Sequence, residues 1–498
     1  MPALGVLLYA SLVGAALWTA GVPLTHEDGF YYFTIARNVA AGNGSTFDGV
    51  HPTNGYHPLW LLVLAGVHRL APSGRALVWG TVLQGALMAA SAALVFLGGR
   101  RVLAKGPAVL AALVFVGLIE RMALSGLELA LHATLVAACA WAWLALGAHT
   151  TRRALATGGL LALGVLARLD VVLLVAALAA AVPQGEARRA RVLAVAGPPL
   201  VALAAYVAWN QLAFGHPFPV SAAAKRLWSN ALVLRDPAYA AGGWAWAKVV
   251  NALFVARHLT STWVLGLAVG TLGAVALSFT PAARATRALR PFAVAGMAQL
   301  AAYVLLHHGE LTYARWYYVL PPLMAAFTAA EVVAWAADRA GRFRDAVPAV
   351  ACVLAALVTA IGLARWRREE SARQPLLEAA VWARTHLPAD ARIGAWNAGS
   401  LGYLSGRTVV NLDGLVNSWA FLESEQFHLC AYWERNGITH LIDAFSEDGP
   451  GGTPVVVPVV LPASQAYAGC ASRLRRVWEG GPEGRPWRVR AYALASAP

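Results

Sequence analysis

Long apolar runs with almost no charged residues recur along most of this chain. A run of about 20 apolar residues is long enough for a helix to cross the hydrocarbon core of a bilayer. Only 13% of the 498 residues are charged and 59% are hydrophobic, whereas ordinary soluble domains carry about 25% and about 45–50%. We therefore predict a polytopic α-helical membrane protein with about eleven transmembrane helices. The expected spans lie at about 1–24, 76–98, 107–120, 129–148, 154–168, 171–184, 192–212, 262–280, 291–307, 317–336 and 346–364.

The first run has no basic segment before it and no clear small-residue cleavage site after it. We interpret it as an uncleaved first span rather than a signal peptide. A shorter apolar stretch near 57–71 carries His68 and Arg69. It is expected either as a short span or as a helix in the membrane interface.

Basic residues lie in short clusters at every second joint between the spans, a pattern that marks cytoplasmic loops. The pattern predicts a cytoplasmic N-terminus, an external first loop at 25–72 and an external C-terminal part; a cluster at 365–368 is an exception. The chain has a net charge of +14, but its basic residues lie between apolar runs. We therefore expect contact with a lipid bilayer and not with nucleic acid. The agreeing clusters lie at 100–105, 152–153, 188–191, 284–290 and 339–344.

The apolar pattern changes after residue 364. Helical spacing from Leu376 to Trp382 is followed by strand-like segments at 392–396, 408–412, 438–442, 455–457 and 489–492. We therefore predict a transmembrane domain at 1–364 and a small external α/β domain at 365–498. An external domain faces an oxidising compartment, in which Cys430 and Cys470 can form a disulfide, although their spacing does not fix the pairing.

Two adjacent acids, Glu27 and Asp28, follow the first span. Adjacent side chains do not share a helix face, so one acid can point into a cavity while the other caps the helix expected around 35–39. A carboxylate at a membrane surface can act as general base for an acceptor hydroxyl. The alternative is that both acids are helix caps or loop charges.

Further polar candidates lie at the other joints assigned to the outer side. They recur together with aromatic residues, which favours a site open to that side over ordinary loop polarity. The alternatives are a helix cap for Glu128, a loop charge for Lys225 and interfacial snorkelling for Arg315. Arg168 and Asp170 are interpreted as a structural ion pair. The site candidates besides the two acids are Tyr31, Asn54, His57, Glu128, Lys225 and Arg315.

Several of these candidates stand in familiar motifs. The acidic pair and aromatic residues of 27–31, with the Asn-Gly-Tyr-His-Pro-Leu-Trp of 54–60, resemble the first external loop of GT-C glycosyltransferases. More narrowly, they are similar to bacterial relatives of the mycobacterial arabinofuranosyltransferases and of the protein O-mannosyltransferase and aminoarabinose-transferase group. Further similar segments are 125–128, 214–219 with Lys225, 315–317 with Pro321, 396–399 and 411–417.

The resemblance implies a GT-C fold and an inverting transfer from a polyprenyl-phosphate sugar to a glycan, lipid or protein acceptor of the cell envelope. It places the enzyme in a bacterial inner membrane with the reaction on the outer face. An acid of the first loop would be the base. We expect Glu27 in that role, because the family pattern aims the first acid at the cavity, and Asp28 as the helix cap.

The same resemblance assigns contacts with the donor phosphate and substrates to His57, Lys225 and Arg315, and further contacts to Tyr31, Asn54 and Glu128. No cofactor is expected. His51 and His57 lack the spacing of a helical metal site, so no metal ligands are assigned, and a divalent metal stays an open alternative.

Two other functions stay open. A transporter or lipid flippase would carry charges at mid-membrane and internal repeats, whereas here the charges gather at the ends of the spans and the halves do not repeat. A non-catalytic scaffold with a glycan-binding external domain would tolerate mutation of the acids. The pattern favours the enzyme.

Overall fold

The computed structural model describes residues 25–71, 74–235, 242–257, 266–267, 269–308, 312, 314–370, 374–446, 455–456, 468–481 and 488–495. The apolar run 1–24, interpreted as the first span, lies outside the described residues. The first part of the run at 262–280 lies outside them too.

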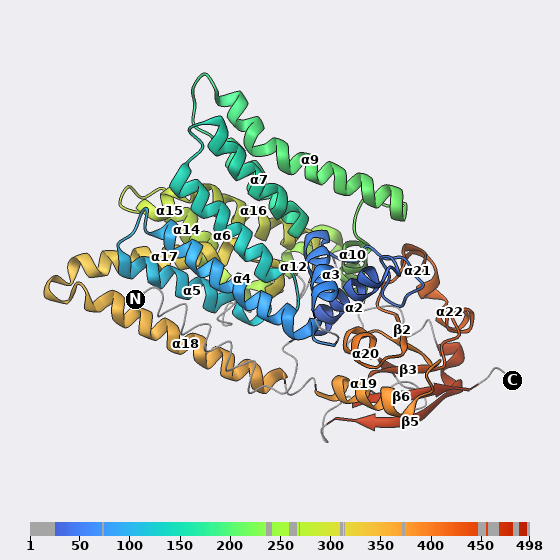
Figure 1. Cartoon of the computed structure of the whole chain (residues 1–498). Coiled ribbons are helices and arrows are strands. Elements are labelled where there is room, and N and C mark those ends of the chain that lie inside the picture. Colours follow the sequence, from blue (N-terminus) through green and yellow to red (C-terminus); the bar gives the residue numbers. More distant parts are fainter. Residues whose placement is uncertain are drawn as a thin grey trace.

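Helices occupy nearly all of the other predicted spans (Figure 1). Within the described part of the chain, five helices are long and apolar enough to cross a membrane: α4 (Ala76–Gly99), α5 (Lys105–Ala123), α6 (Leu129–Leu146), α9 (Arg188–Phe214) and α17 (Leu320–Arg339). The total of about eleven spans stays a prediction. The other helices at predicted spans are α7 (Thr151–Ala167), α8 (Val172–Ala180), α14 (Ala274–Leu277), α16 (Arg290–Leu306) and α18 (Ala346–Glu370).

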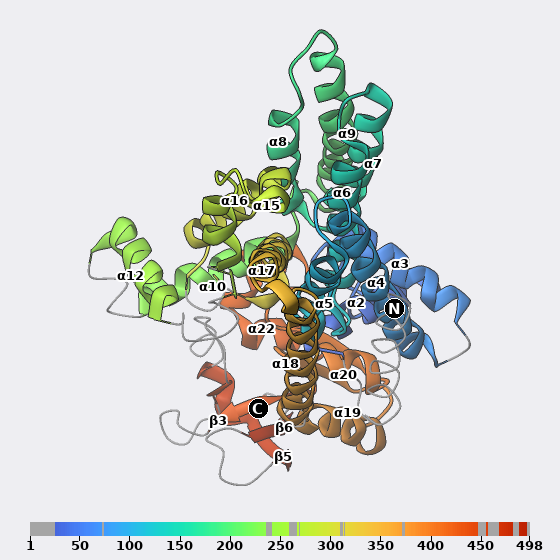
Figure 2. The same ribbon diagram turned by 90° about the vertical axis from the view of Figure 1, so that its left-hand side faces the viewer.

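These helices pack through small residues and apolar faces. Helix α7 lies alongside α9, α4 packs between α5 and α6, and α18 runs along α5 (Figures 1 and 2). Gly158 illustrates the close approach in the first of these pairs, because a Cβ at this position would collide with the carbonyl oxygen of Ala194 on α9. Exposed leucine and valine side chains cover the outer faces of several helices, as expected for surfaces that meet lipid.

Two short helices form the segment between the N-terminal run and α4. Helix α2 (Glu27–Ala41) packs against α3 (Pro58–Leu70), and both lie between the helical bundle and the sheet (Figure 1). The helix expected around 35–39 therefore begins earlier. His26 is its N-cap, because the His26 Nδ1 accepts a hydrogen bond of 3.2 Å from the backbone N–H of Asp28. Glu27 and Asp28 occupy the first turn, where the helix dipole favours negative charge.

Further along the chain, α10 (Val220–Arg235), α12 (Gly243–Arg257) and α15 (Arg284–Ala288) connect the longer helices. Helix α10 contacts the C-terminal region through α21 (Trp419–Glu423). This contact brings the middle of the chain against the sheet domain.

The C-terminal region forms one mixed sheet. Its order is β2–β1–β3–β6–β5, with β4 paired to β3. Strand β1 runs parallel to β2 and β3, whereas β6 runs antiparallel to both β3 and β5. The strands predicted from the sequence are confirmed, and β5 is an additional strand that was not predicted. The strands are β1 (Arg392–Ala395), β2 (Thr408–Asn411), β3 (His440–Ser446), β4 (Val455–Val456), β5 (Leu474–Gly480) and β6 (Arg488–Leu494).

The helices of this region lie before and between the strands. They are α19 (Gln374–His386), α20 (Gly399–Leu404), α21 and α22 (Leu429–Arg435). The parallel strands therefore alternate with helices, as the α/β prediction requires.

Cys430 and Cys470 form a disulfide with their Cα atoms 5.8 Å apart, so the expected pairing is confirmed. The bridge joins α22 to a 3-10 helix at Ala468–Arg473. Cys139 and Cys352, on α6 and α18, are free.

Reduction of this disulfide is expected to destabilise the C-terminal region. The bond closes a loop across a sequence separation of 40 residues, and a bond of this kind contributes about 2–4 kcal/mol. Thermal unfolding of the wild type followed by tryptophan fluorescence should show a lower Tm with reductant. The Cys470→Ser variant should have that lower Tm without reductant and no further shift with it. An unchanged Tm in both comparisons would contradict the structural role of the bond.

Candidate functional site

A pocket opens where the first loop, the helical bundle and the C-terminal region meet. It encloses about 550 Å³ when its open side is included. Charged, aromatic and apolar side chains share its wall. The lining residues are Asp28, Tyr31, Tyr32, Ile35, Gly55, Tyr56, His57, Leu127, Glu128, Arg168, Ser221, Lys225, Trp316, Tyr317 and Leu415.

Most of the candidates from the sequence meet in this pocket. They come from segments far apart in the chain: the first loop, the loop before α6, and α10. Three candidates lie elsewhere, namely Glu27, Asn54 and Arg315. The five candidates that line the pocket are Asp28, Tyr31, His57, Glu128 and Lys225.

The two adjacent acids point in different directions, as expected, but their placement is the reverse of the expected one. The Glu27 Oε2 accepts a hydrogen bond of 2.9 Å from the backbone N–H of Ser400, in the first turn of α20. A Cβ at Gly399 would collide with the Glu27 carbonyl oxygen, so α2 and α20 are in close contact. The preference for Glu27 as the acid in the cavity was therefore wrong in its geometry, because this carboxylate caps a helix of the C-terminal region.

Asp28 is the acid that lines the pocket. Its side chain is 27% exposed, and its Oδ1 lies 3.9 Å from the His26 Nδ1. Within the described residues, His26 is the one basic side chain at ion-pair distance from it. The Asp28 carboxylate therefore keeps lone pairs available to a molecule in the pocket.

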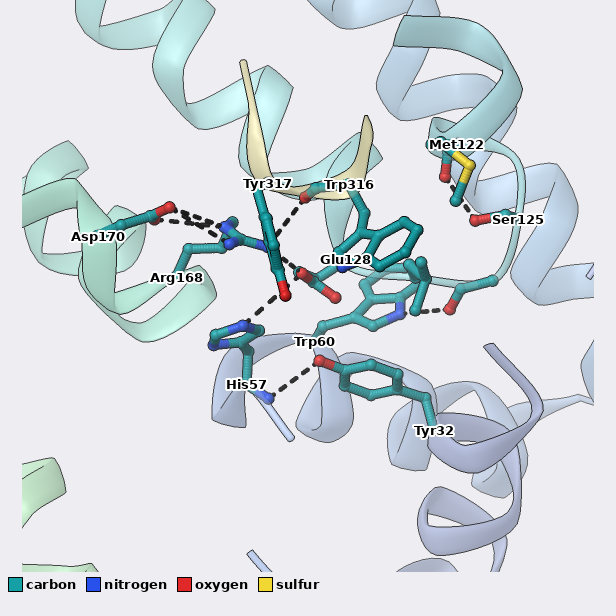
Figure 3. Close-up of polar contacts among 12 residues, drawn as sticks. Tyr32, His57, Trp60, Met122, Ser125, Glu128, Arg168, Asp170, Trp316 and Tyr317 are labelled. Carbon is teal, nitrogen blue, oxygen red and sulfur yellow. Dashed lines mark hydrogen bonds and ion pairs between the residues drawn. The ribbon is translucent and has the colours of Figure 1, made fainter. Parts of the chain in front are cut away.

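A buried arginine organises the opposite wall (Figure 3). The Arg168 Nη1 donates to the Glu128 Oε1 at 2.6 Å and to the carbonyl oxygen of Trp316 at 3.0 Å. Its Nη2 lies 3.2 Å from the Asp170 Oδ2, which also accepts from the Tyr303 hydroxyl at 2.8 Å. The Arg168–Asp170 pair expected from the sequence is present. Arg168 also holds Glu128 and the 3-10 turn at Arg315–Tyr317, two contacts that were not predicted from the sequence.

Glu128 itself is positioned by a tight turn. Gly126 has φ of 89°, a left-handed conformation that favours glycine. Its N–H donates to the Gln84 Oε1 at 3.1 Å, and its carbonyl accepts from the Trp60 Nε1 at 2.9 Å (Figure 3). The Ser-Gly-Leu-Glu motif thus places its acid in the pocket by fixing the backbone before it.

His57 lies beside Glu128, with its Nε2 3.7 Å from the Glu128 Oε1 (Figure 3). Its backbone N–H donates to the Tyr32 hydroxyl at 3.0 Å. Burial lowers the pKa of His57 to about 4, although the nearby Glu128 acts in the opposite direction. The imidazole is therefore neutral near pH 7 and offers a hydrogen bond rather than a positive charge.

Lys225 supplies a cation of a different kind. Its Nζ lies 5.3 Å from the ring centre of Tyr317 and 5.8 Å from that of Trp316. No carboxylate of the described residues lies within ion-pair distance of this ammonium group, whereas Arg168 is neutralised by Glu128 and Asp170. Lys225 is therefore available to an anion in the pocket.

Asn54 does not line the pocket, so its expected contact with substrate is corrected to a structural role. Its side chain is fully buried. The Asn54 Nδ2 donates to the carbonyl oxygen of Phe218 at 3.0 Å. Its Oδ1 accepts from the Val220 N–H at 2.9 Å and from the Trp419 Nε1 at 3.2 Å. Asn54 thus joins the first loop to the start of α10 and to α21.

Arg315 also lies outside the lining, although the next two residues of its 3-10 turn, Trp316 and Tyr317, belong to it. Among the described residues, no group of three or more His, Cys, Asp or Glu side chains has a metal-binding arrangement. The carboxylates of Glu128 and Asp170 are bridged by Arg168 instead.

The comparisons with known proteins agree with this architecture. No curated protein matches the sequence. A family described as "Domain of unknown function (DUF8728)" matches residues 363–476, which include β1 to β3.

Solved structures match much more of the chain. ArnT from Cupriavidus metallidurans bound to undecaprenyl phosphate is 13% identical, with a TM-score of 0.60, over 99% of this chain and 98% of that one. Its apo form has 14% identity, a TM-score of 0.56 and the same coverage. The oligosaccharyltransferase AglB from Archaeoglobus fulgidus, in complex with an inhibitory peptide and a dolichol-phosphate, is 14% identical, with a TM-score of 0.51, over 88% of this chain and 69% of that one.

These relatives are GT-C membrane glycosyltransferases, and the chain has their fold. The GT-C resemblance drawn from the motifs is thereby confirmed at the level of the fold. The architecture is that of a multi-pass membrane protein with a mixed α/β region at one end.

Proposed function

We propose that this protein is an integral-membrane glycosyltransferase that moves a sugar from a polyprenyl-phosphate donor to a cell-envelope acceptor, with inversion. One observation carries the proposal. The Asp28 carboxylate and the Lys225 ammonium group line the same pocket, and neither is neutralised by a strong ion pair within the described residues. A transfer from a lipid phosphate needs both a proton acceptor and a cation for the leaving group.

Asp28 would act as the general base. It would take the proton of the acceptor hydroxyl while that oxygen attacks the anomeric carbon of the donor. The new glycosidic bond forms as the bond between the anomeric carbon and the phosphate oxygen breaks, so the configuration inverts. Glu128 lines the pocket too, but Arg168 binds it at 2.6 Å, and this ion pair makes it a weaker proton acceptor than Asp28.

Lys225 would bind the phosphate as negative charge develops on it. Trp316 and Tyr317 hold the Lys225 ammonium group by cation–π contacts, which reduces the freedom that binding has to remove. The neutral His57 would donate or accept one further hydrogen bond. The ArnT structure bound to undecaprenyl phosphate and the AglB complex with a dolichol-phosphate support a lipid phosphate as the ligand class.

In the proposed topology, the reaction takes place on the outer face of a bacterial inner membrane. The alternating arginine clusters put the N-terminus inside and the C-terminal region outside. In intact cells, a membrane-impermeant maleimide should therefore label an exposed Ser424→Cys variant. A Thr151→Cys variant, exposed at a joint assigned to the cytoplasm, should react only after permeabilisation. The reverse result would contradict the orientation.

The identity of the sugar and acceptor follows from a separate experiment. Mass analysis of lipid-linked sugars and envelope glycans from a deletion strain should show an accumulated donor and a glycan that lacks one residue. An envelope without change would argue against transfer in the cell.

A further inference from the structure

The C-terminal region does more than cover the pocket, because it is joined to α2 beside Asp28. Leu415, which follows β2, lines the pocket, and a Cβ at Gly55 would collide with the Leu415 carbonyl oxygen. Glu27 caps α20. A third connection between α2 and the C-terminal region is made by the hydroxyl group of Tyr31.

Tyr31 lies on the pocket wall three residues after Asp28, and positions i and i+3 share one face of a helix. Its hydroxyl lies 2.9 Å from the Asp413 Oδ2 and 3.0 Å from the carbonyl oxygen of Trp396. The Asn411 Nδ2 donates to the same hydroxyl at 3.4 Å. All these partners belong to loops or strand ends of the C-terminal region.

Asp413 is itself fixed and almost fully buried. Its Oδ1 accepts from the Leu415 N–H at 2.7 Å. One carboxyl group therefore holds both Tyr31 and the backbone that presents Leu415. Since Tyr31 and Leu415 both line the pocket, a displaced Asp413 changes the pocket wall on two sides.

The contacts around Tyr31 can accommodate a protonated Asp413. A tyrosine hydroxyl has one proton, yet it faces two acceptors, the Asp413 carboxyl and the Trp396 carbonyl. A protonated Asp413 would donate to Tyr31, which could then donate to Trp396, so that every group is satisfied. Burial raises the pKa of Asp413 to about 7, although the hydrogen bonds with Leu415 and Tyr31 act in the opposite direction.

We propose that Asp413 is a positioning residue of the transfer site, through which the C-terminal region holds Tyr31 and Leu415 beside Asp28. The inference rests on the proposed function and extends it, because it assigns a role in the reaction to the domain of unknown function. Asp413 acts through Tyr31 and Leu415, and it does not itself line the pocket.

A double-mutant cycle separates this role from simple docking of the domain. The purified full-length chain would be assayed with a polyprenyl-phosphate sugar for kcat and KM. Asp413→Leu should lower kcat about tenfold to a hundredfold, the cost of a reacting group misplaced by about 1 Å or less, with little change in KM. Tyr31→Phe should lower kcat too, and the double variant should be no worse than Asp413→Leu alone. Additive losses, or no loss in Asp413→Leu, would overturn the proposal.

The conservative variant Asp413→Asn should keep most of the kcat that Asp413→Leu loses. In Asp413→Asn, the amide Nδ2 can donate to Tyr31 while the Oδ1 accepts from Leu415, which reproduces the protonated arrangement. Its kcat at pH 7 should stay within about threefold of the wild type, well above the loss expected from misplacement. Glu378→Gln, an exposed acid on α19, is the matched control and should leave kcat unchanged. An Asn variant as slow as the Leu variant would contradict the arrangement.

The pH dependence gives a readout that needs no transfer. The titratable groups that act on Asp413 are Tyr31 and Asp28, both on α2. Because the folded-state pKa is raised from 3.8 to about 7, the folded chain binds more protons than the unfolded one in that range. The contribution of the Asp413 carboxyl to the free energy of unfolding therefore falls as the pH rises through that range. The Tm of Asp413→Asn relative to wild type should rise from pH 5 to pH 7.5.

The two proposals can fail separately. If the wild type transfers no sugar but the Tm difference rises with pH, the proposed function fails and the Asp413–Tyr31 contact stands. If transfer occurs and the Tm difference is flat, with additive losses in the cycle, the positioning role fails and the glycosyltransferase stands.

Discussion

Asp28→Asn is expected to reduce sugar transfer by about 10²–10⁴-fold, the usual loss when a general base is removed. The amide keeps the size and hydrogen-bonding shape of the side chain but cannot take the acceptor proton. Asp28 lines the pocket, and within the described part of the chain His26, at 3.9 Å, is the one basic side chain near its carboxylate. The variant should therefore fold normally, bind the donor and leave it intact. The measurement is transfer by purified variants with a polyprenyl-phosphate sugar.

Glu27→Gln is the matched control for this prediction. The glutamine oxygen can still accept the hydrogen bond from the Ser400 N–H, so most of the activity should remain, with a small decrease in Tm. A larger loss in Glu27→Gln than in Asp28→Asn would assign the base to Glu27. Parent rates in both variants would reject the site, and the transporter and scaffold hypotheses would gain support.

Lys225→Met is expected to weaken binding of undecaprenyl phosphate about tenfold to a hundredfold, since a hydrogen bond to a charged group contributes about 1.5–3 kcal/mol. Methionine is similar to lysine in length and is apolar, so the pocket wall should be retained while the cation is lost. No other pocket-lining cation of the described chain is free to replace it, because Arg168 is engaged by Glu128 and Asp170. Binding can be measured as the shift in Tm across a titration with undecaprenyl phosphate.

Lys248→Met gives the control for Lys225. Lys248 lies 5.5 Å from the ring centre of Trp244 on α12 and does not line the pocket. Lys248 carries the same ammonium group outside the pocket, so the Lys248→Met variant should bind undecaprenyl phosphate with the affinity of the wild type. Equal affinities for wild type and Lys225→Met would remove the lysine from the donor site.

Much of the helical architecture could be predicted because it depends on local composition. Apolar runs give nearly every helix of the bundle, and alternating segments give the strands of the C-terminal region. The exceptions have local causes too. Helix α2 starts at Glu27 because His26 caps it, and α8 ends at Ala180, before Pro183.

The orientation of the two acids could not be predicted, because it depends on a partner far along the chain. Both residues lie in the first turn of α2, and nothing nearby distinguishes them. Glu27 turns toward Ser400, which is 373 residues away. This contact leaves the pocket to Asp28. Of the two acids that the family pattern indicates, Asp28 and not Glu27 lines the pocket.

The roles of Asn54 and Arg168 show the same limit. Asn54 stands in the motif of the first loop, yet its amide is used by α10 and α21. Arg168 was interpreted as half of a local ion pair, yet it also binds Glu128, 40 residues away. The sequence does contain one indication of these further contacts. Arg168 and Asp170 stand at the end of an apolar run, and charged side chains in a membrane are energetically unfavourable unless further polar groups bind them.

The central claim is that this pocket transfers a sugar from a lipid phosphate. The most direct test incubates the purified full-length chain with a panel of polyprenyl-phosphate sugars and envelope acceptors, and measures released polyprenyl phosphate together with the glycosylated product. We expect equal amounts of the two, an inverted anomeric configuration, and about 10²–10⁴-fold less of both products from Asp28→Asn. Intact donors with a wild-type chain that binds undecaprenyl phosphate, or equal turnover by Asp28→Asn, would contradict it.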